Sequence, residues 1–118
     1  MRDDVERLRQ RTREFGLRIM RLCDTLPHSR SANVIAYQLL RSGTSPGAQY
    51  REAIRSRSNA ELISKFESIL QELDETTYWM ELLVDGEIVA APKLEPLRNE
   101  ADELIAIFVS SVKNLKGR

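Results

Sequence analysis

Arginines are the residues in this chain with the clearest chemical potential. Arg7, Arg11 and Arg18 recur at intervals of four and seven, so they share one stripe of a helix, and Arg21 extends it. Guanidinium groups pair with phosphate oxygens in a bidentate manner, so this stripe predicts a nucleic-acid-binding surface. Two features weigh against it, the formal net charge of zero and the acids in the same segment: Asp3, Asp4, Glu6 and Glu14.

Carboxylates offer a second kind of chemistry. Glu72 and Glu75, with Glu52 brought across from a neighbouring helix, could form a cluster that binds magnesium or calcium rather than zinc. Solvated helix faces explain the same residues, so a divalent-ion site is the remote alternative. His28 is the only histidine, which excludes the usual di-metal bundle, and Cys23 is expected to be a small packed residue. We predict no catalytic residue, no cofactor and no metal.

The stretch QLLRSGTSPGAQYREA, residues 38–53, has too many small residues for an ordinary helix. A phosphate-binding loop would need a preceding strand and a terminal Gly-Lys-Ser/Thr, and neither is present. We therefore interpret the stretch as a helix thinned so that a neighbouring backbone can approach it closely. Pro46 removes the hydrogen bond to the Ser42 carbonyl, which predicts a kink.

The elements that must position these residues follow from heptad spacing. Apolar residues repeat at intervals of three and four in three segments, and weaker spacing continues through the thinned stretch. Ser58 and Glu61 have capping-box spacing, and Asp85-Gly86 ends a helix, although VDGEIVA could instead form a small hairpin. The predicted helices cover residues 3–26, 30–57, 59–84 and 93–115.

Short connections between four such helices favour an all-α, antiparallel up-down-up-down bundle in one domain, residues 1–118. Reflecting the second helix onto the third about the turn near residue 58 places Arg41 opposite Glu75, a pair expected to fix the register of the two helices. The same reflection gives three further pairs: Ser45 with Gln71, Gln49 with Glu67, and Arg55 with Glu61. We interpret the last as ordinary surface charges.

Composition and charge bound the class of protein. One cysteine, no apolar run long enough to cross a bilayer and a charged N-terminal segment favour a cytoplasmic protein without membrane association. Residues 1–57 carry 12 arginines and 6 acids, a net charge of +6, whereas residues 58–118 carry 6 basic and 12 acidic residues, a net charge of −6. A head-to-tail contact between copies could join these halves into a ring.

Three stretches together resemble a known family, the four-helix-bundle proteins named for the intervening sequences of bacterial 23S rRNA genes. The stretches are QLLRSGTSPGAQYREA, SKFESILQELDETTYWMELL and EADELIAIF. The matching positions are Gln38, Leu39, Arg41, Ser42, Gly43, Thr44, Ser45, Gly47, Ala48, Glu52, Glu75, Thr76, Tyr78, Trp79, Leu82, Leu83, Glu103 and Leu104. Two positions depart from the family pattern, since Gln49 stands where Asn is usual and Pro46 where an aliphatic residue is common.

The resemblance implies an antiparallel bundle that assembles as a homopentamer, has no established enzymatic activity and is related to the accessory protein of diversity-generating retroelements. We expect a non-catalytic oligomeric scaffold that binds RNA or an RNA-associated protein through the arginine stripe. The alternative is a purely structural assembly protein whose basic and acidic faces contact each other. We expect structural or interface roles for Arg41, Ser42, Gly43, Ser45, Gly47, Gln49, Glu52, Glu75, Tyr78 and Trp79.

Overall fold

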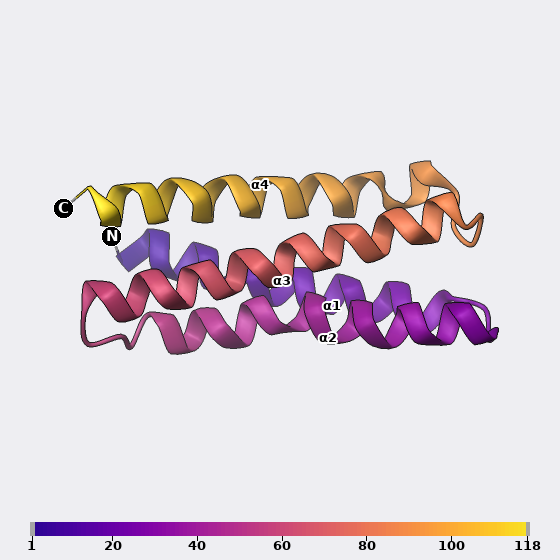
Figure 1. Cartoon of the computed structure of the whole chain (residues 1–118), viewed down its shortest axis with the longest axis horizontal. Coiled ribbons are helices and arrows are strands. Elements are labelled where there is room, and N and C mark those ends of the chain that lie inside the picture. The colour runs from indigo at the N-terminus through magenta and orange to yellow at the C-terminus, as the bar shows by residue number, and fades with distance from the viewer. Residues whose placement is uncertain (1, 118) are drawn as a thin grey trace.

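The computed structural model describes residues 2–117 and consists of four long helices. They are α1 (Arg2–Thr25), α2 (Arg30–Ala53), α3 (Asn59–Asp85) and α4 (Ala91–Lys116). Each helix packs antiparallel against the next, so α1 begins and α4 ends at the same end of an elongated bundle (Figure 1). The predicted all-α, up-down-up-down fold is therefore confirmed. Within residues 2–117, no helix is apolar over enough of its length to cross a bilayer.

Helix ends follow from local chemistry. Ser29 and Ser58 cap α2 and α3, their side-chain oxygens accepting hydrogen bonds from the amides of Ala32 and Glu61. The Glu61 carboxylate in turn accepts the Arg57 amide at 3.1 Å, which completes a variant of the predicted capping box. Because Ser58 must be extended to cap α3, the residues before it form a turn, and α2 ends at Ala53 instead of the predicted residue 57.

The turn after α3 is formed by the residues that cap the C-terminal end of that helix. Gly86 caps the helix through its amide, which donates to the Leu82 carbonyl at 2.8 Å. The amides of Ile88 and Val89 both donate to the Leu83 carbonyl, so these residues fold back onto the end of α3. The alternative hairpin in VDGEIVA is therefore wrong, since residues 84–90 contain no strand.

The core contains most of the predicted heptad positions, from Phe15 and Ile19 in α1 to Leu104 and Phe108 in α4. Two positions shift by one residue. The predicted intervals of three and four lead from Pro46 to Gln49 in the second helix and from Phe108 to Ser111 in the fourth, but the buried residues are Tyr50 and Val112. The reason for the first shift is an aromatic cluster, because the Tyr50 ring lies 6.1 Å from the ring of Phe66 and 5.9 Å from that of Phe108.

α2 continues as a helix through Pro46. The hydroxyls of Thr44 and Ser45 donate to the carbonyls of Leu40 and Arg41, both at 2.7 Å, and so add hydrogen bonds next to the one that the proline removes. The helix is therefore unbroken at Pro46, and the kink itself stays a prediction.

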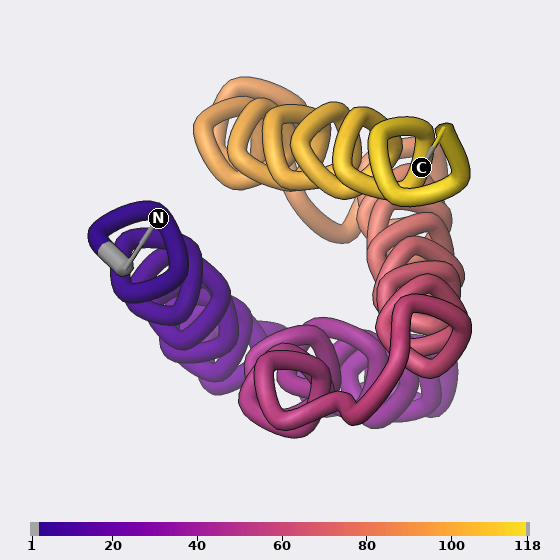
Figure 2. The backbone as a smooth tube through the Cα atoms, turned by 90° about the vertical axis from the view of Figure 1, so that its left-hand side faces the viewer, coloured from indigo at the N-terminus to yellow at the C-terminus, as the bar shows by residue number. Residues whose placement is uncertain are grey.

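The four helices do not close evenly around the core. Seen from the end of the bundle, α1 and α4 are farther apart than the helices that follow each other in the chain (Figure 2). The contact between α1 and α4 therefore differs from the other three, and the arginine stripe lies beside it.

Candidate functional site

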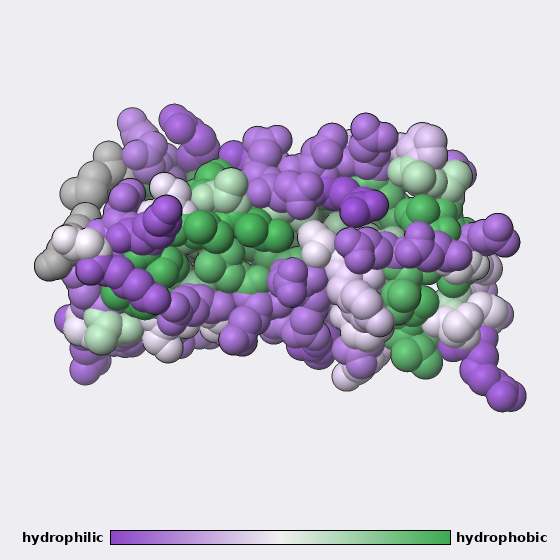
Figure 3. All heavy atoms as spheres, turned by 45° about the horizontal axis from the view of Figure 1, so that its top comes forward, coloured by the Kyte–Doolittle hydropathy of each residue, from purple (hydrophilic) through white to green (hydrophobic). Residues whose placement is uncertain are grey.

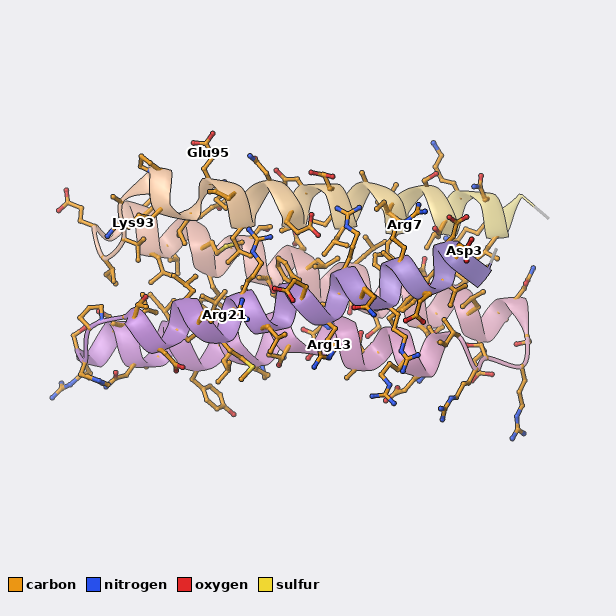
Figure 4. The ribbon with its side chains drawn as sticks, turned by 180° about the vertical axis from the view of Figure 1, so that it is seen from behind. Asp3, Arg7, Arg13, Arg21, Lys93 and Glu95 are labelled. Carbon is orange, nitrogen blue, oxygen red and sulfur yellow. The ribbon has the colours of Figure 1, made fainter. Side chains whose placement is uncertain are left out.

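The arginine stripe lies on the side of α1 that faces α4. Arg7 and Arg11 line a groove of about 350 Å³ whose far wall includes Ile107 of α4. Arg18 and Arg21 line a second groove, of about 550 Å³, with Lys93 of α4. Figure 4 shows Arg7 on the side of α1 toward α4. The predicted spacing therefore does place all four arginines along one side of the helix.

Arg11 connects the two helices between these grooves. Its guanidinium donates to Glu100 at 2.6 and 3.1 Å and to Glu103 at 3.2 Å. The hydrogen bond to Glu100 raises the pKa of Arg11 further above its ordinary value. Since the side chains of Arg11 and Glu100 are only 29% and 18% exposed, this contact holds α1 to α4. Nothing in the sequence signalled Glu100, because the pairing of the first helix with the last depends on the closure of the bundle.

Of the other stripe arginines, Arg7 and Arg21 are exposed, whereas Arg18 is half-buried like Arg11. Arg7 lies 3.6 Å from Asp4, and Arg21 lies 3.4 Å from Glu14, both within α1. Arg18 has no ion-pair partner within residues 2–117. The acids of the same helix therefore offset part of the positive charge of this side.

The expected pair between α2 and α3 is present and belongs to a small polar network. Arg41 donates to Glu75 at 2.8 Å, to Glu72 at 3.4 Å and to Gln38 at 3.3 Å. The predicted contact of Arg41 with Glu75 is confirmed, and the sequence missed the second carboxylate, that of Glu72.

The carboxylate cluster proposed as an ion site is wrong. Glu72 and Glu75 share Arg41, whereas Glu52 pairs with Lys65 at 3.1 Å. Over the described part of the chain, no three side chains of the metal-binding types lie close enough to hold an ion.

None of the three other reflected pairs forms a hydrogen bond or an ion pair within the described residues. Ser45 donates within α2, Glu67 pairs with Lys116 of α4, and Glu61 caps the turn before α3. Arg55 has no ion-pair partner within residues 2–117, as expected for a surface charge. Gln49 is half-buried, and its side-chain oxygen is buried without a hydrogen-bond partner.

Deeper between α2 and α3, the Ser42 and Thr76 hydroxyls share a hydrogen bond of 2.9 Å, and both residues are fully buried. Trp79 packs against the core, with its indole nitrogen buried and unpartnered, whereas the neighbouring Tyr78 is exposed. Their rings still touch edge to face, with centroids 5.1 Å apart. The expected interface residues of α2 and α3 thus lie mostly along one seam of the bundle.

The thinned stretch has a clear packing role against α1. A Cβ atom placed on Gly43 would lie 2.6 Å from Cγ1 of Ile19, and one on Gly47 would lie 3.3 Å from the Thr12 carbonyl oxygen. Gly16 faces the backbone of Thr44 from the other side. The small residues predicted in α2 therefore allow α1 to pack closely against it. The sequence interpretation overlooked Gly16, the small residue on α1 that faces them.

Close packing of α1 on α2 creates a basic groove on their outer side. It has a volume of about 380 Å³, and three arginines line it, Arg9 and Arg13 from α1 and Arg51 from α2. Figure 4 shows Arg13 on the side of α1 away from α4, over α2. This groove was not predicted, although the arginines that form it were visible in the sequence.

Cys23 and His28 do not form a reactive pair. Cys23 is half-buried beside α2, and its thiol donates to the Ala36 carbonyl at 3.5 Å. Burial, with a smaller contribution from Asp24, raises the pKa of the Cys23 thiol to about 11. His28 lies exposed in the turn after α1. The prediction that Cys23 is a packed residue is therefore confirmed.

Comparison with known proteins adds a family and a related structure. The sequence model of the family described as 23S rRNA-intervening sequence protein matches residues 6–110. A crystal structure from Bacteroides thetaiotaomicron, of a protein with unknown function from the S23 ribosomal protein family, is 36% identical to this chain. The match covers 90% of this chain and 98% of that one, with a TM-score of 0.84. No curated protein matches the sequence.

Proposed function

Since the chain belongs to the 23S rRNA-intervening sequence protein family, we propose that it is a non-catalytic scaffold that assembles with itself and binds RNA through the arginines of α1. The observation that carries this proposal is the composition of the surface of α1 and α2. These helices and their ends contain 12 of the 14 arginines. They also carry six of the eight large apolar side chains that are notably exposed in the described part of the chain: Val5, Met20, Val34, Tyr37, Leu40 and Ile54.

Self-assembly is supported by a stripe on α2. Val34, Tyr37 and Leu40 recur every three residues and are 58%, 67% and 39% exposed. Monomers rarely leave such side chains side by side in water, and subunit contacts are enriched in tyrosine. The face over α3 and α4 differs, because its apolar side chains lie in separate areas between charged ones (Figure 3), with Tyr78 and Val109 the most exposed.

RNA binding is supported by the arginine-rich surface, because phosphate contacts dominate the affinity of proteins for nucleic acids. A ring of five copies, which the resemblance implies, would repeat that surface in each subunit. A role beside a reverse transcriptase, like that of the retroelement accessory protein, is one form that this function could take.

Light scattering on a sizing column, at low and high salt, tests both parts of the proposal. We expect a particle near five times 13.6 kDa that elutes with nucleic acid at low salt and without it at high salt. Replacing Tyr37 or Val34 with Ser should dissociate the particle, whereas Val109→Ser, at an exposed valine of α4, serves as the matched control for the valine. A monomer that carries no nucleic acid and binds no added RNA would overturn the proposal.

A purely structural assembly is the second candidate. It is favoured by the opposite net charges of the two halves of the chain, +6 and −6, which could attract each other between copies. In that case the particle would form without RNA and dissociate at high salt.

A further inference from the structure

The groove between α1 and α2 concentrates positive charge that the rest of the chain does not neutralise. Arg13 and Arg51 have no acidic partner within residues 2–117, and Arg9 has only the exposed Glu6 of its own helix, at 3.5 Å. By contrast, Arg11 of the α1–α4 side is held by Glu100 and Glu103. The two edges of α1 therefore differ in the charge they can offer to a ligand.

The groove also continues in both directions. A depression of about 250 Å³ shares Arg9 and Arg13 with it, and another, of about 340 Å³, shares Arg51 and adds Arg55. Together the groove and these depressions bring four guanidinium groups to one side of α1 and α2, and the two acids that also line the depressions, Glu6 and Glu52, pair with Arg9 and Lys65. Such an arrangement suits a linear polyanion better than a single small anion.

The glycines explain how arginines from two helices come to line one groove. The position of a Cβ on Gly47 is 3.6 Å from Cα of Arg13, and Arg51 lies one helical turn beyond Gly47. Leu17 is half-buried in the groove and Met20 is 45% exposed, so both can contact ribose or base faces.

A second copy of the chain is a less suitable occupant. Six of the twelve acids in residues 58–118 already lie within 4.0 Å of a cation of the same chain: Glu67, Glu72, Glu75, Glu81, Glu100 and Glu103. A phosphodiester chain, in contrast, has a charge on each unit and no internal cation.

From these observations we infer that the α1–α2 groove binds the phosphate backbone of single-stranded RNA through Arg9, Arg13, Arg51 and Arg55. The inference rests on the proposed RNA-binding function and assigns the phosphate contacts to the edge of α1 that faces away from the predicted stripe.

Fluorescence anisotropy with a labelled oligouridylate tests this assignment on the full chain. The groove variant is Arg13→Gln/Arg51→Gln, and the matched control is Arg98→Gln/Lys113→Gln, which removes the same charge from α4. A third variant, Arg7→Gln/Arg21→Gln, removes it from the predicted stripe, and a loss of affinity as large as that of the groove variant would reject the assignment to the groove. We expect the groove variant to bind at least about tenfold more weakly and to lower the slope of log K against log salt by about 1.4, since each phosphate contact contributes about 0.7. The control should stay within about twofold of the wild type.

The other outcomes overturn the inference in distinguishable ways. Weaker binding by the control alone, equal losses in both variants, or no loss in either would reject the groove while RNA binding itself stands. A groove variant that dissociates the particle, as judged by light scattering, would make the groove a contact between copies. Absence of binding by the wild type would reject the proposed function together with the groove. Thermal melts of all three variants confirm that they are folded.

Discussion

α1 packs against α2 on one side and against α4 on the other, and the two contacts are built in opposite ways. Toward α2 it presents Gly16 and Ile19 to the glycines of α2, so that the backbones approach closely, and no ion pair joins the two helices among residues 3–117. Toward α4 it presents arginines, and Arg11 spans the distance to Glu100 between two grooves. Small residues bring helices together, whereas long charged ones hold them at a distance and leave open surface.

The largest effect should come from truncating the tight contact. Ile19→Ala removes a fully buried side chain that packs on Gly43, and we expect a loss of about 2–5 kcal/mol in the free energy of unfolding. Leu22→Ala, at the half-buried wall of the larger α1–α4 groove, should cost only about 1 kcal/mol. Urea denaturation of both variants measures the difference, and equal losses would contradict the contrast between the two contacts.

Replacing Gly43 or Gly16 with alanine should have opposite effects on stability, although the two positions look alike in the sequence. Gly43→Ala gains about 1 kcal/mol in helix propensity but collides with Ile19, so we expect a net loss of up to about 2 kcal/mol. Gly16→Ala meets only an ordinary contact, 3.6 Å from Cα of Thr44, and should stabilise the protein by up to about 1 kcal/mol. Chemical denaturation gives both values.

Combining Gly43→Ala with Ile19→Ala provides the control for this collision. The second substitution removes the Cγ atoms that the new methyl group would meet. The double variant should therefore lose less stability than the sum of the single ones. Strict additivity would show that Gly43 is not needed for the approach of α1.

A smaller effect is expected at the polar bridge. A double-mutant cycle with Arg11→Met and Glu100→Gln should give a coupling of about 0.5–1 kcal/mol, because the pair is partly exposed, and the coupling should fall in 1 M salt. The same cycle at the exposed pair of Arg7 and Asp4 is the comparison and should give a coupling near zero. A larger coupling at Arg7 would contradict the structural role assigned to Arg11.

The last prediction concerns the reactivity of the Cys23 thiol. The raised pKa of this thiol does not change the free energy of unfolding near neutral pH. Because the pKa of Cys23 is raised from 9.0 to about 11, the folded protein at pH 8 has about 100-fold less thiolate than an ordinary thiol. Alkylation by iodoacetamide should be slower in the folded protein by at least that factor than in urea, and should accelerate as the pH rises toward 11. Rapid alkylation at pH 8 would mean that the contact of α1 with α2 opens easily around Cys23.

Much of the fold could be read from the sequence, because heptad spacing and capping residues are local signals. The same reasoning found Arg41 and Glu75, since a hairpin of two consecutive helices has a simple reflection rule. It failed for Tyr50, because the aromatic cluster of Tyr50, Phe66 and Phe108 draws together three helices and outweighs the local spacing. The α1–α4 side and the α1–α2 groove were only partly predictable, because they too depend on how different helices pack against each other.

The sequence by itself determined the four helices, their order, their antiparallel hairpins and the arginine-rich first half of the chain. Only the tertiary structure decided which helix packs against the small residues of α2, which arginines are neutralised by acids and which face outward. Arg11 and Arg13 are two residues apart and look equivalent in the sequence, yet one is held by Glu100 and the other lines an open groove. Residues two apart lie on nearly opposite sides of a helix, so they face different neighbours, and the charge that remains at each residue depends on the neighbour it meets.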